Sequence, residues 1–225
     1  MRLVHASAVA VAAALLVPAG LTAQNQDPDR VVAGGGIMVE GWKGKVDARA
    51  AGRGSTVKDS KFEMMGDAIH ATIGPAAIYW NPAHTATGSY TVSATFKELK
   101  TDMGHPHPAG IFIGGQDLET DQYKYLYCTV YGTGEFLVNE FTGAGARPET
   151  RAAKQAHAAI NKPAADGSAT NKVAWRVTGD RAECLVNDTV VAGFDTSALG
   201  STEGIYGLRF SHNMDAMVTG FGVER

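Results

Sequence analysis

The stretch Tyr123–Phe141, which reads YKYLYCTVYGTGEFLVNEF, decides the fold class. Two runs rich in Tyr, Val, Phe and Thr are joined by the glycine turn at 132–134, and this pattern is typical of an antiparallel hairpin. Side chains alternate between the faces of a strand. One face of the first strand carries Tyr123, Tyr125, Tyr127, Thr129 and Tyr131, and the other carries Leu126, Cys128 and Val130. The second face is typical of a core, and the first is a candidate ligand platform.

Short apolar or alternating runs continue on both sides of this hairpin. They cover residues 37–46, 62–73, 77–80, 90–99, 111–114, 173–178, 182–186, 190–194, 204–211 and 217–223. Turn residues recur between them and no long helical period appears, so we expect roughly ten to thirteen strands in an all-β, two-sheet antiparallel β-sandwich or jelly roll. Residues 148–160 have good helix propensity, and for them we expect a loop with at most one helical turn before Pro163.

The N-terminal sequence and the net charge indicate which class of protein this is. Residues 1–23 read as a secretory signal peptide, with Arg2, an apolar run at 9–17 and the cleavage-type sequence Leu21-Thr22-Ala23. The apolar run is too short to span a bilayer, so we expect an exported protein, periplasmic or extracellular. Residues 24–36 read as a flexible lead before one domain at 37–225. The net charge of −3 and the lack of a basic block argue against nucleic-acid binding.

The chain has two cysteines, Cys128 and Cys184. In an oxidising compartment they fit one disulfide, and two buried free thiols are the alternative.

Several stretches together resemble the concanavalin A-like lectin/glucanase superfamily. They are Gly41–Asp47, Tyr79-Trp80 followed by Gly88–Val92, Ala109–Leu118, the tyrosine-rich hairpin, Cys184–Val190 and Gly204–Phe210. The layout is similar to that of laminin G-like modules and of exported bacterial domains similar to 3-keto-disaccharide hydrolases. The resemblance covers about residues 37 to 225 and implies two curved antiparallel sheets with a concave face that often holds carbohydrate.

The chain departs from the laminarinase-type enzymes of that superfamily at one motif. Those enzymes carry Glu-x-Asp-x-x-Glu, whereas the run from Glu119 to Lys124 keeps the first two acids and lacks the third. Because retaining glycosidases need two carboxyl groups about 5 Å apart, this departure favours binding over catalysis and leaves the enzyme question open. If the protein is a glycosidase-like hydrolase, Glu140 is the best candidate for the acid or base.

The leading interpretation is a module that binds carbohydrate or a related ligand on its concave face. Tyrosine rings pack against the C–H faces of sugars, and polar neighbours meet the hydroxyl groups. The predicted ligand-binding residues are Tyr125, Tyr127, Glu140 and Arg209, with His105, His107 and Trp80 at the rim. A structural or adhesive interaction module with no small ligand is the third possibility, and the oligomeric state stays open.

Two motifs bear on metals. The segment His105-Pro106-His107-Pro108 projects two imidazoles to one side, so it could ligate a metal with His84 or His212 as third ligand, although a rigid surface loop is the simpler interpretation. Asp117, Glu119 and Asp121 alternate in one loop and offer oxygens to calcium, but a solvated acidic turn explains them as well. We therefore expect no obligatory cofactor.

Overall fold

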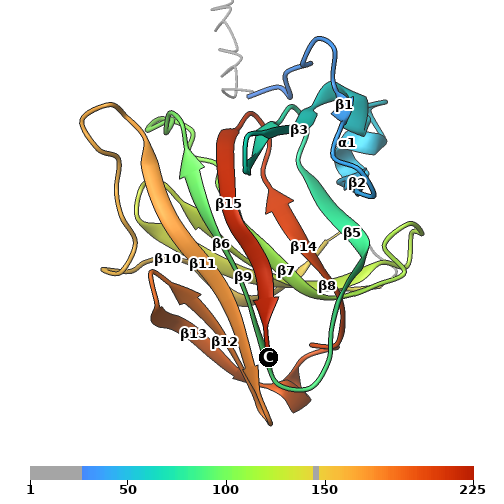
Figure 1. The fold of residues 1–225 in the computed structure, drawn as a ribbon, viewed down its shortest axis with the longest axis vertical. Coiled ribbons are helices and arrows are strands. Elements are labelled where there is room, and N and C mark those ends of the chain that lie inside the picture. Colours follow the sequence, from blue (N-terminus) through green and yellow to red (C-terminus); the bar gives the residue numbers. More distant parts are fainter. Residues whose placement is uncertain (1–26, 144–146) are drawn as a thin grey trace, which may run out of the picture.

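The sandwich in the computed structural model, which describes residues 27–143 and 147–225, has two packed β-sheets (Figure 1). In spatial order, the eight-stranded sheet contains β1 (Gly36–Ile37), β3 (Lys61–Met65), β4 (Ala68–Thr72), β15 (Asp215–Glu224), β6 (Tyr90–Glu98), β11 (Ala169–Thr178), β12 (Arg181–Val186) and β13 (Thr189–Asp195). The seven-stranded sheet contains β10 (Glu149–Ala156), β9 (Glu135–Thr142), β8 (Lys124–Tyr131), β7 (Pro108–Gln116), β14 (Gly204–Phe210), β5 (Ala77–Ala86) and β2 (Lys43–Val46). Short helical turns lie at α1 (Ala48–Ala51), η1 (Val57–Asp59) and η2 (Thr196–Ala198).

The pairing confirms the predicted fold class. All neighbouring strands in the described ranges run antiparallel except β1 and β3, which run parallel. The predicted hairpin is formed by β8 and β9, and Leu126, Cys128 and Val130 lie in the core between the sheets, as their parity predicted.

One disulfide bond and one hydrogen bond link the two sheets across the core, and they lie side by side. Cys128 of β8 and Cys184 of β12 form the predicted disulfide, which joins the two sheets. Next to it, the indole Nε1 of Trp175 donates to the carbonyl oxygen of Ile111 over 3.1 Å. The strand registers explain this proximity, because Trp175 pairs with Cys184 in one sheet and Ile111 pairs with Cys128 in the other. We call these two links the central cross-ties.

Two segments differ from their sequence-based expectations. Residues 149–156, expected to be a loop with at most a helical turn, form the edge strand β10, with irregular register against β9. Pairing with an exposed strand edge supplies the backbone hydrogen bonds here, so tertiary contact overrides the helix propensity. The single run at 62–73 divides into β3 and β4 at the turn formed by Gly66 and Asp67.

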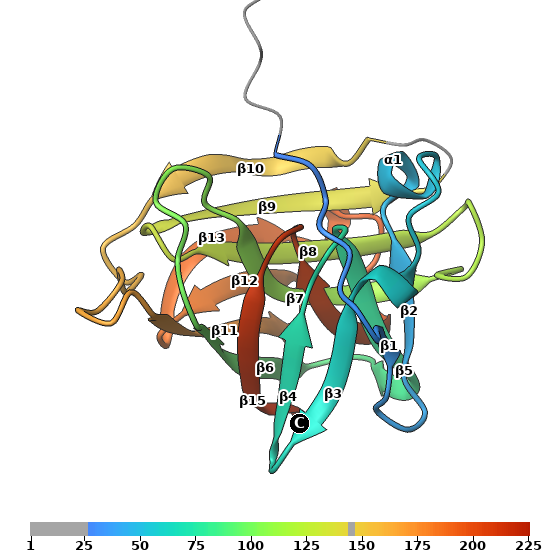
Figure 2. The same cartoon turned by 90° about the horizontal axis from the view of Figure 1, so that it is seen from above.

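The described part of the segment before β1 makes hydrogen bonds to the body of the sandwich. The backbone N–H of Arg30 donates to Asn213 Oδ1 over 2.8 Å, and its side-chain Nε donates to the carbonyl oxygen of Ile73 over 2.9 Å. Val32 N–H donates to the carbonyl oxygen of Asp59 over 3.1 Å. The segment therefore lies across one end of the sandwich, the end seen in Figure 2.

The predicted signal peptide, residues 1–23, and the first part of the predicted lead lie outside the described residues. Within the described ranges, no helix is long and apolar enough to cross a membrane.

Candidate functional site

The outward face of the seven-stranded sheet carries the tyrosine row, but most of that row is closed. Tyr123 and Tyr125 pack in a second hydrophobic cluster that is separate from the main core. The other buried members of this cluster are Ile78, Trp80, Phe112, Leu118, Tyr127 and Phe141. Tyr125 is 3 % exposed and Trp80 is 2 % exposed. Both side chains are therefore largely covered by their neighbours in this cluster. Trp80 still borders a hollow of about 410 Å³ and Tyr125 borders one of about 110 Å³.

Arg209 lies on this face and is held by a partner that sequence inspection missed. Its guanidinium donates two hydrogen bonds to the carboxylate of Asp47, each 2.6 Å long. Burial alone would lower the pKa of Arg209, but the Asp47 carboxylate raises it overall, so the side chain stays charged. The guanidinium carbon also lies 5.5 Å from the ring centroid of Tyr127. Arg209 and Tyr127 therefore lie together, with the arginine fixed in a planar, bidentate pair with Asp47.

Beside this pair the outward face opens into a hollow of about 170 Å³. We call it the tyrosine hollow, and its lining residues are Pro108, Tyr127, Thr129, Tyr131, Leu137, Arg209 and Ser211. Tyr131 is partly exposed there, and the ammonium of Lys154 lies 4.0 Å from its ring centroid. The hydroxyl of Thr129 is buried and has no hydrogen-bond partner among the described residues. The hollow thus combines aromatic surface with a fixed cation.

Glu140 does not belong to the tyrosine face. Residues directly opposite in a hairpin share a face, and β9 pairs Asn139 with Tyr127 but Glu140 with the core residue Leu126. Accordingly, the amide of Asn139 donates to the hydroxyl of Tyr127 over 3.0 Å. Asn139, rather than Glu140, is therefore the neighbour of Tyr127, while Glu140 and Tyr125 border the same hollow of about 110 Å³.

The bonds of Glu140 also weigh against a catalytic role. Its carboxylate accepts the backbone N–H of Gly200 over 2.6 Å and the Nε–H of Arg151 over 2.7 Å. A second carboxylate, Glu149, does lie nearby, but Nη2 of Arg151 contacts both acids, at 2.5 Å and 3.1 Å. Each oxygen of the Glu140 carboxylate therefore already accepts a hydrogen bond from the protein, one from Gly200 and one from Arg151.

The two histidines expected at the rim lie instead at the end of the sandwich. His107 and His212 continue the inward parity of the core residues Ala109 and Phe210, which pair across β7 and β14. Both imidazoles face the carboxylate of Asp27, and His105 lies beside the same carboxylate. Of the two third ligands named from the sequence, His212 is therefore the one that comes close to His107.

His84 is elsewhere in the molecule. It packs against the rings of Trp42, Tyr206 and Phe221, with centroid distances of 5.7, 5.4 and 5.8 Å.

The acidic loop at 117–121 does not gather its oxygens around one point. Glu119 pairs with Lys43 at 2.7 Å, and Asp121 lies 3.8 Å from the ammonium of Lys45. Within the part of the chain that the structure describes, Asp117, Glu119 and Asp121 do not form a group with metal-ligand spacing. The calcium alternative therefore has no geometric support.

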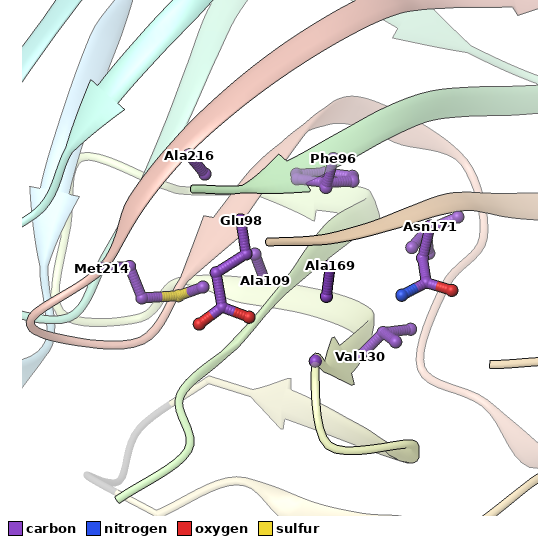
Figure 3. A pocket seen from close by; sticks show the side chains of 10 residues that line it. Phe96, Glu98, Ala109, Val130, Ala169, Asn171, Met214 and Ala216 are labelled. Atoms are coloured by element: carbon purple, nitrogen blue, oxygen red, sulfur yellow. The ribbon is translucent and has the colours of Figure 1, made fainter. Parts of the chain in front are cut away.

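A small pocket between the sheets holds a carboxyl group that sequence inspection missed. Glu98 points into it near Met214 and Ala109, as Figure 3 shows, and Thr101 Oγ1 donates to it over 2.9 Å. Burial raises the pKa of Glu98 to about 7. The pocket has about 20 Å³ of free volume, enough for one water molecule and far too little for a sugar ring. Glu98 is therefore a buried titrating group and not a ligand site.

The missed members of the tyrosine hollow differ in how far the sequence signals them. Thr129 and Tyr131 share the strand parity of Tyr127, so alternation alone includes them. Asp47 precedes Arg209 by 162 residues, and no local pattern links the two.

Comparison with known proteins supports the fold class. No family model and no curated protein sequence matches the chain. Solved structures with similar folds include the carbohydrate binding module CBM66 from Bacillus subtilis, at 12% identity, with 84% of this chain and 100% of that chain covered and a TM-score of 0.56. A Bacillus subtilis protein of unknown function with a galectin-like fold aligns at 14% identity over 81% of this chain and 88% of that chain, with a TM-score of 0.57.

The endo-beta-1,3-glucanase of Pyrococcus furiosus is also similar, at 8% identity over 81% of this chain and 88% of that chain, with a TM-score of 0.53. These structures are jelly-roll sandwiches of the concanavalin A-like kind. At such low identity the likeness shows the fold and no more.

Proposed function

We propose that this protein binds carbohydrate, or a related polyhydroxylated ligand, in the tyrosine hollow on the outward face of the seven-stranded sheet. The observation that carries the proposal is that the same hollow is lined by the rings of Tyr127 and Tyr131, the fixed guanidinium of Arg209 and the side chain of Ser211. The rings offer apolar surface to the C–H groups of a sugar, and the polar groups meet its hydroxyls.

The size and the charge of the hollow limit the kinds of ligand that it can bind. A space of about 170 Å³ suits one sugar residue or the end of a glycan better than a long chain laid across the sheet. Asp47 occupies one edge of the Arg209 guanidinium through Nη1 and Nη2. Only the remaining N–H groups are left for a ligand, so we expect neutral or singly acidic sugars rather than heavily sulfated ones.

The fold neighbours are consistent with this class of ligand. One is described as a carbohydrate binding module and another as an endo-beta-1,3-glucanase. The disulfide between Cys128 and Cys184 is consistent with an oxidising compartment, and we propose that the protein is exported to the periplasm or the extracellular space.

A glycosidase-like hydrolase, similar to the 3-keto-disaccharide hydrolases, is the alternative that the sequence leaves open. Acid-base hydrolysis of a glycoside needs a carboxyl group at the sugar. The residues that line the tyrosine hollow include no carboxylate, and Glu140 is held by Arg151 on the other side of the sheet. These observations favour binding.

The test is a glycan array with the purified protein, followed by calorimetric titration of any glycan that binds. Tyr131→Ala removes one ring, and Ser211→Leu fills the hollow without touching the aromatic cluster. Each change is expected to lower the affinity at least tenfold. The matched control, Thr219→Leu, adds the same side chain at an exposed position on β15 in the other sheet, and it is expected to bind as the wild type does.

Two outcomes would overturn the proposal. The first is a glycan that binds equally well to the wild type and to both hollow variants, since its site then lies elsewhere. The second is silence across the array, which favours a structural or adhesive interaction module.

A further inference from the structure

We propose that Asp27, His107 and His212 form a binding site for a transition-metal ion of the Zn²⁺ type at the end of the sandwich. The ligand atoms of these three side chains all lie within 4.8 Å of one another. They come from three segments far apart in the sequence: the segment before β1, the loop before β7 and the turn after β14.

The distances between the ligand atoms are compatible with a bound ion. Oδ2 of Asp27 lies 2.8 Å from Nε2 of His107 and 3.7 Å from Nε2 of His212. A tetrahedral Zn²⁺ ion with bonds of about 2.0 Å holds its ligand atoms about 3.3 Å apart. The two observed distances lie on either side of this value. A separation of 3.7 Å is too long for a hydrogen bond, so the protein brings the His212 imidazole toward the carboxylate without bonding it there.

A further imidazole reaches the same point. Nδ1 of His105 lies 3.7 Å from Oδ2 of Asp27, and the side chain of His105 is 43 % exposed. One carboxylate oxygen is thus approached by three imidazoles, of which one is at hydrogen-bond distance. His105 is placed to become the fourth ligand after a small rotation, and otherwise that position is left for water.

The surrounding residues hold the proposed ligands in place. Oδ1 of Asp27 accepts the side-chain amide of Asn213 over 2.7 Å, which leaves Oδ2 for the ion. Oδ1 of Asp29 lies 2.9 Å from Nδ1 of His212 without hydrogen-bond geometry, and Nε2 of that ring is the nitrogen on the side of Asp27. A carboxylate beside the far nitrogen of a ligating histidine is a recurring outer-shell arrangement at zinc sites.

Register fixes the two histidines opposite each other. Phe210 pairs with Ala109, and the backbone N–H of Ser211 donates to the carbonyl oxygen of Pro108 over 2.9 Å. The flanking residues His107 and His212 therefore face each other, with ring centroids 4.3 Å apart. The site rests on two rigid strand ends, and only Asp27 is supplied by the segment that crosses them.

The chemistry of the three proposed ligands determines which metal ions would bind. Two imidazoles and one carboxylate suit Zn²⁺, Co²⁺, Ni²⁺ or Cu²⁺, whereas Ca²⁺ and Mg²⁺ prefer oxygen ligands alone. We expect one Zn²⁺ per chain and no measurable effect of Ca²⁺ or Mg²⁺ at the same concentration.

The experiment titrates Zn²⁺ into the metal-stripped full-length protein by calorimetry and records the visible absorption of the Co²⁺ form, whose intensity reports tetrahedral coordination. Asp27→Asn and His212→Gln are each expected to lower the Zn²⁺ affinity at least 100-fold and to abolish the Co²⁺ absorption. Asp29→Asn, next to the ligands, is expected to cost about 10- to 100-fold. Circular dichroism without metal checks that each variant is folded.

His70→Gln is the matched control. His70 also faces carboxylates, with Nε2 2.7 Å from Asp215 and Nδ1 4.0 Å from Glu63, but no second histidine joins this pair in the described ranges. This variant is expected to keep full Zn²⁺ affinity.

A second readout tests the link to the segment before β1. Zn²⁺ is expected to slow proteolysis between residues 27 and 36 in the wild type but not in His212→Gln, because the ion fastens Asp27 to the strand ends. Binding of less than one Zn²⁺ per chain, or equal binding in Asp27→Asn, His212→Gln and the wild type, would overturn the proposal and leave Asp27 as a simple ion-pair partner of the histidines.

Discussion

Removing the disulfide is the sharpest test of how this sandwich is stabilised. The bond joins Cys128 and Cys184, which lie 56 residues apart in the sequence with Cα atoms 6.3 Å apart. Both side chains are fully buried. The perturbation is the double variant Cys128→Ala/Cys184→Ala, which removes the link between the sheets and leaves no free thiol.

The expected magnitude follows from the length of the closed loop. Linking residues 56 positions apart lowers the entropy of the unfolded chain by an amount worth about 4 kcal/mol at 25 °C. The hydrogen bond from Trp175 to Ile111 remains in the variant and keeps the sheets in register. We therefore expect a folded protein whose free energy of unfolding is about 4 kcal/mol lower than that of the wild type.

Equilibrium unfolding in urea measures this loss. With an m-value of about 2–2.5 kcal/mol/M, the midpoint is expected to fall by roughly 1.5–2 M. The wild type unfolded and refolded in a reducing agent serves as a second measurement of the same quantity. A variant within about 1 kcal/mol of the wild type would refute the reasoning, as would mass spectrometry that finds two free thiols in the purified protein.

Three further changes test single contacts. Burial raises the pKa of Glu98 from its ordinary 4.5 to about 7. The contribution of Glu98 to the free energy of unfolding is therefore full below pH 4.5 and is lost as the pH rises through 7. In Glu98→Gln this pH-dependent decrease, on the order of 2 kcal/mol, should disappear, which is seen as a flatter dependence of Tm on pH above 4.5. Asp47→Asn leaves the Arg209 guanidinium buried without its carboxylate and should cost about 2–3 kcal/mol in urea unfolding; an unchanged midpoint would contradict the bidentate pair. Gly110→Ala places a Cβ 2.0 Å from a backbone carbonyl oxygen of β8 and should cost more than about 2 kcal/mol by thermal denaturation, whereas Gly222→Ala, with nothing within 4 Å, should cost little.

The strand pattern could be predicted from sequence because it depends on neighbours two residues apart. The alternation in β8 placed Leu126, Cys128 and Val130 in the core correctly. Residues 149–156 could not be predicted in the same way, because their strand conformation comes from pairing with β9 and not from their own propensity.

The candidate site was harder to predict than the fold, for a related reason. Parity shows that Tyr125 and Tyr127 share a face, but it does not show what covers that face. Leu118 and the Asp47–Arg209 pair reach it from other parts of the chain. Whether Glu140 or Asn139 lies beside Tyr127 depends on the register of β9 with β8. The sequence His105-Pro106-His107 indicated two possible metal ligands, but no sequence motif identifies Asp27 as a third.

The central cross-ties have a mechanical consequence. If the chain is pulled from its two ends, the loop closed between Cys128 and Cys184 bears no load, because the force passes through the disulfide instead. A loop of 56 residues holds back about 190 Å of contour length at roughly 3.4 Å per residue. In a single-molecule stretching experiment the oxidised protein would therefore extend by that much less than the reduced one. The tension would enter through the terminal strands β1 and β15, which lie in one sheet. Of the strands that line the tyrosine hollow, β9 and the second half of β8 lie inside the shielded loop, whereas β7 and β14 lie outside it.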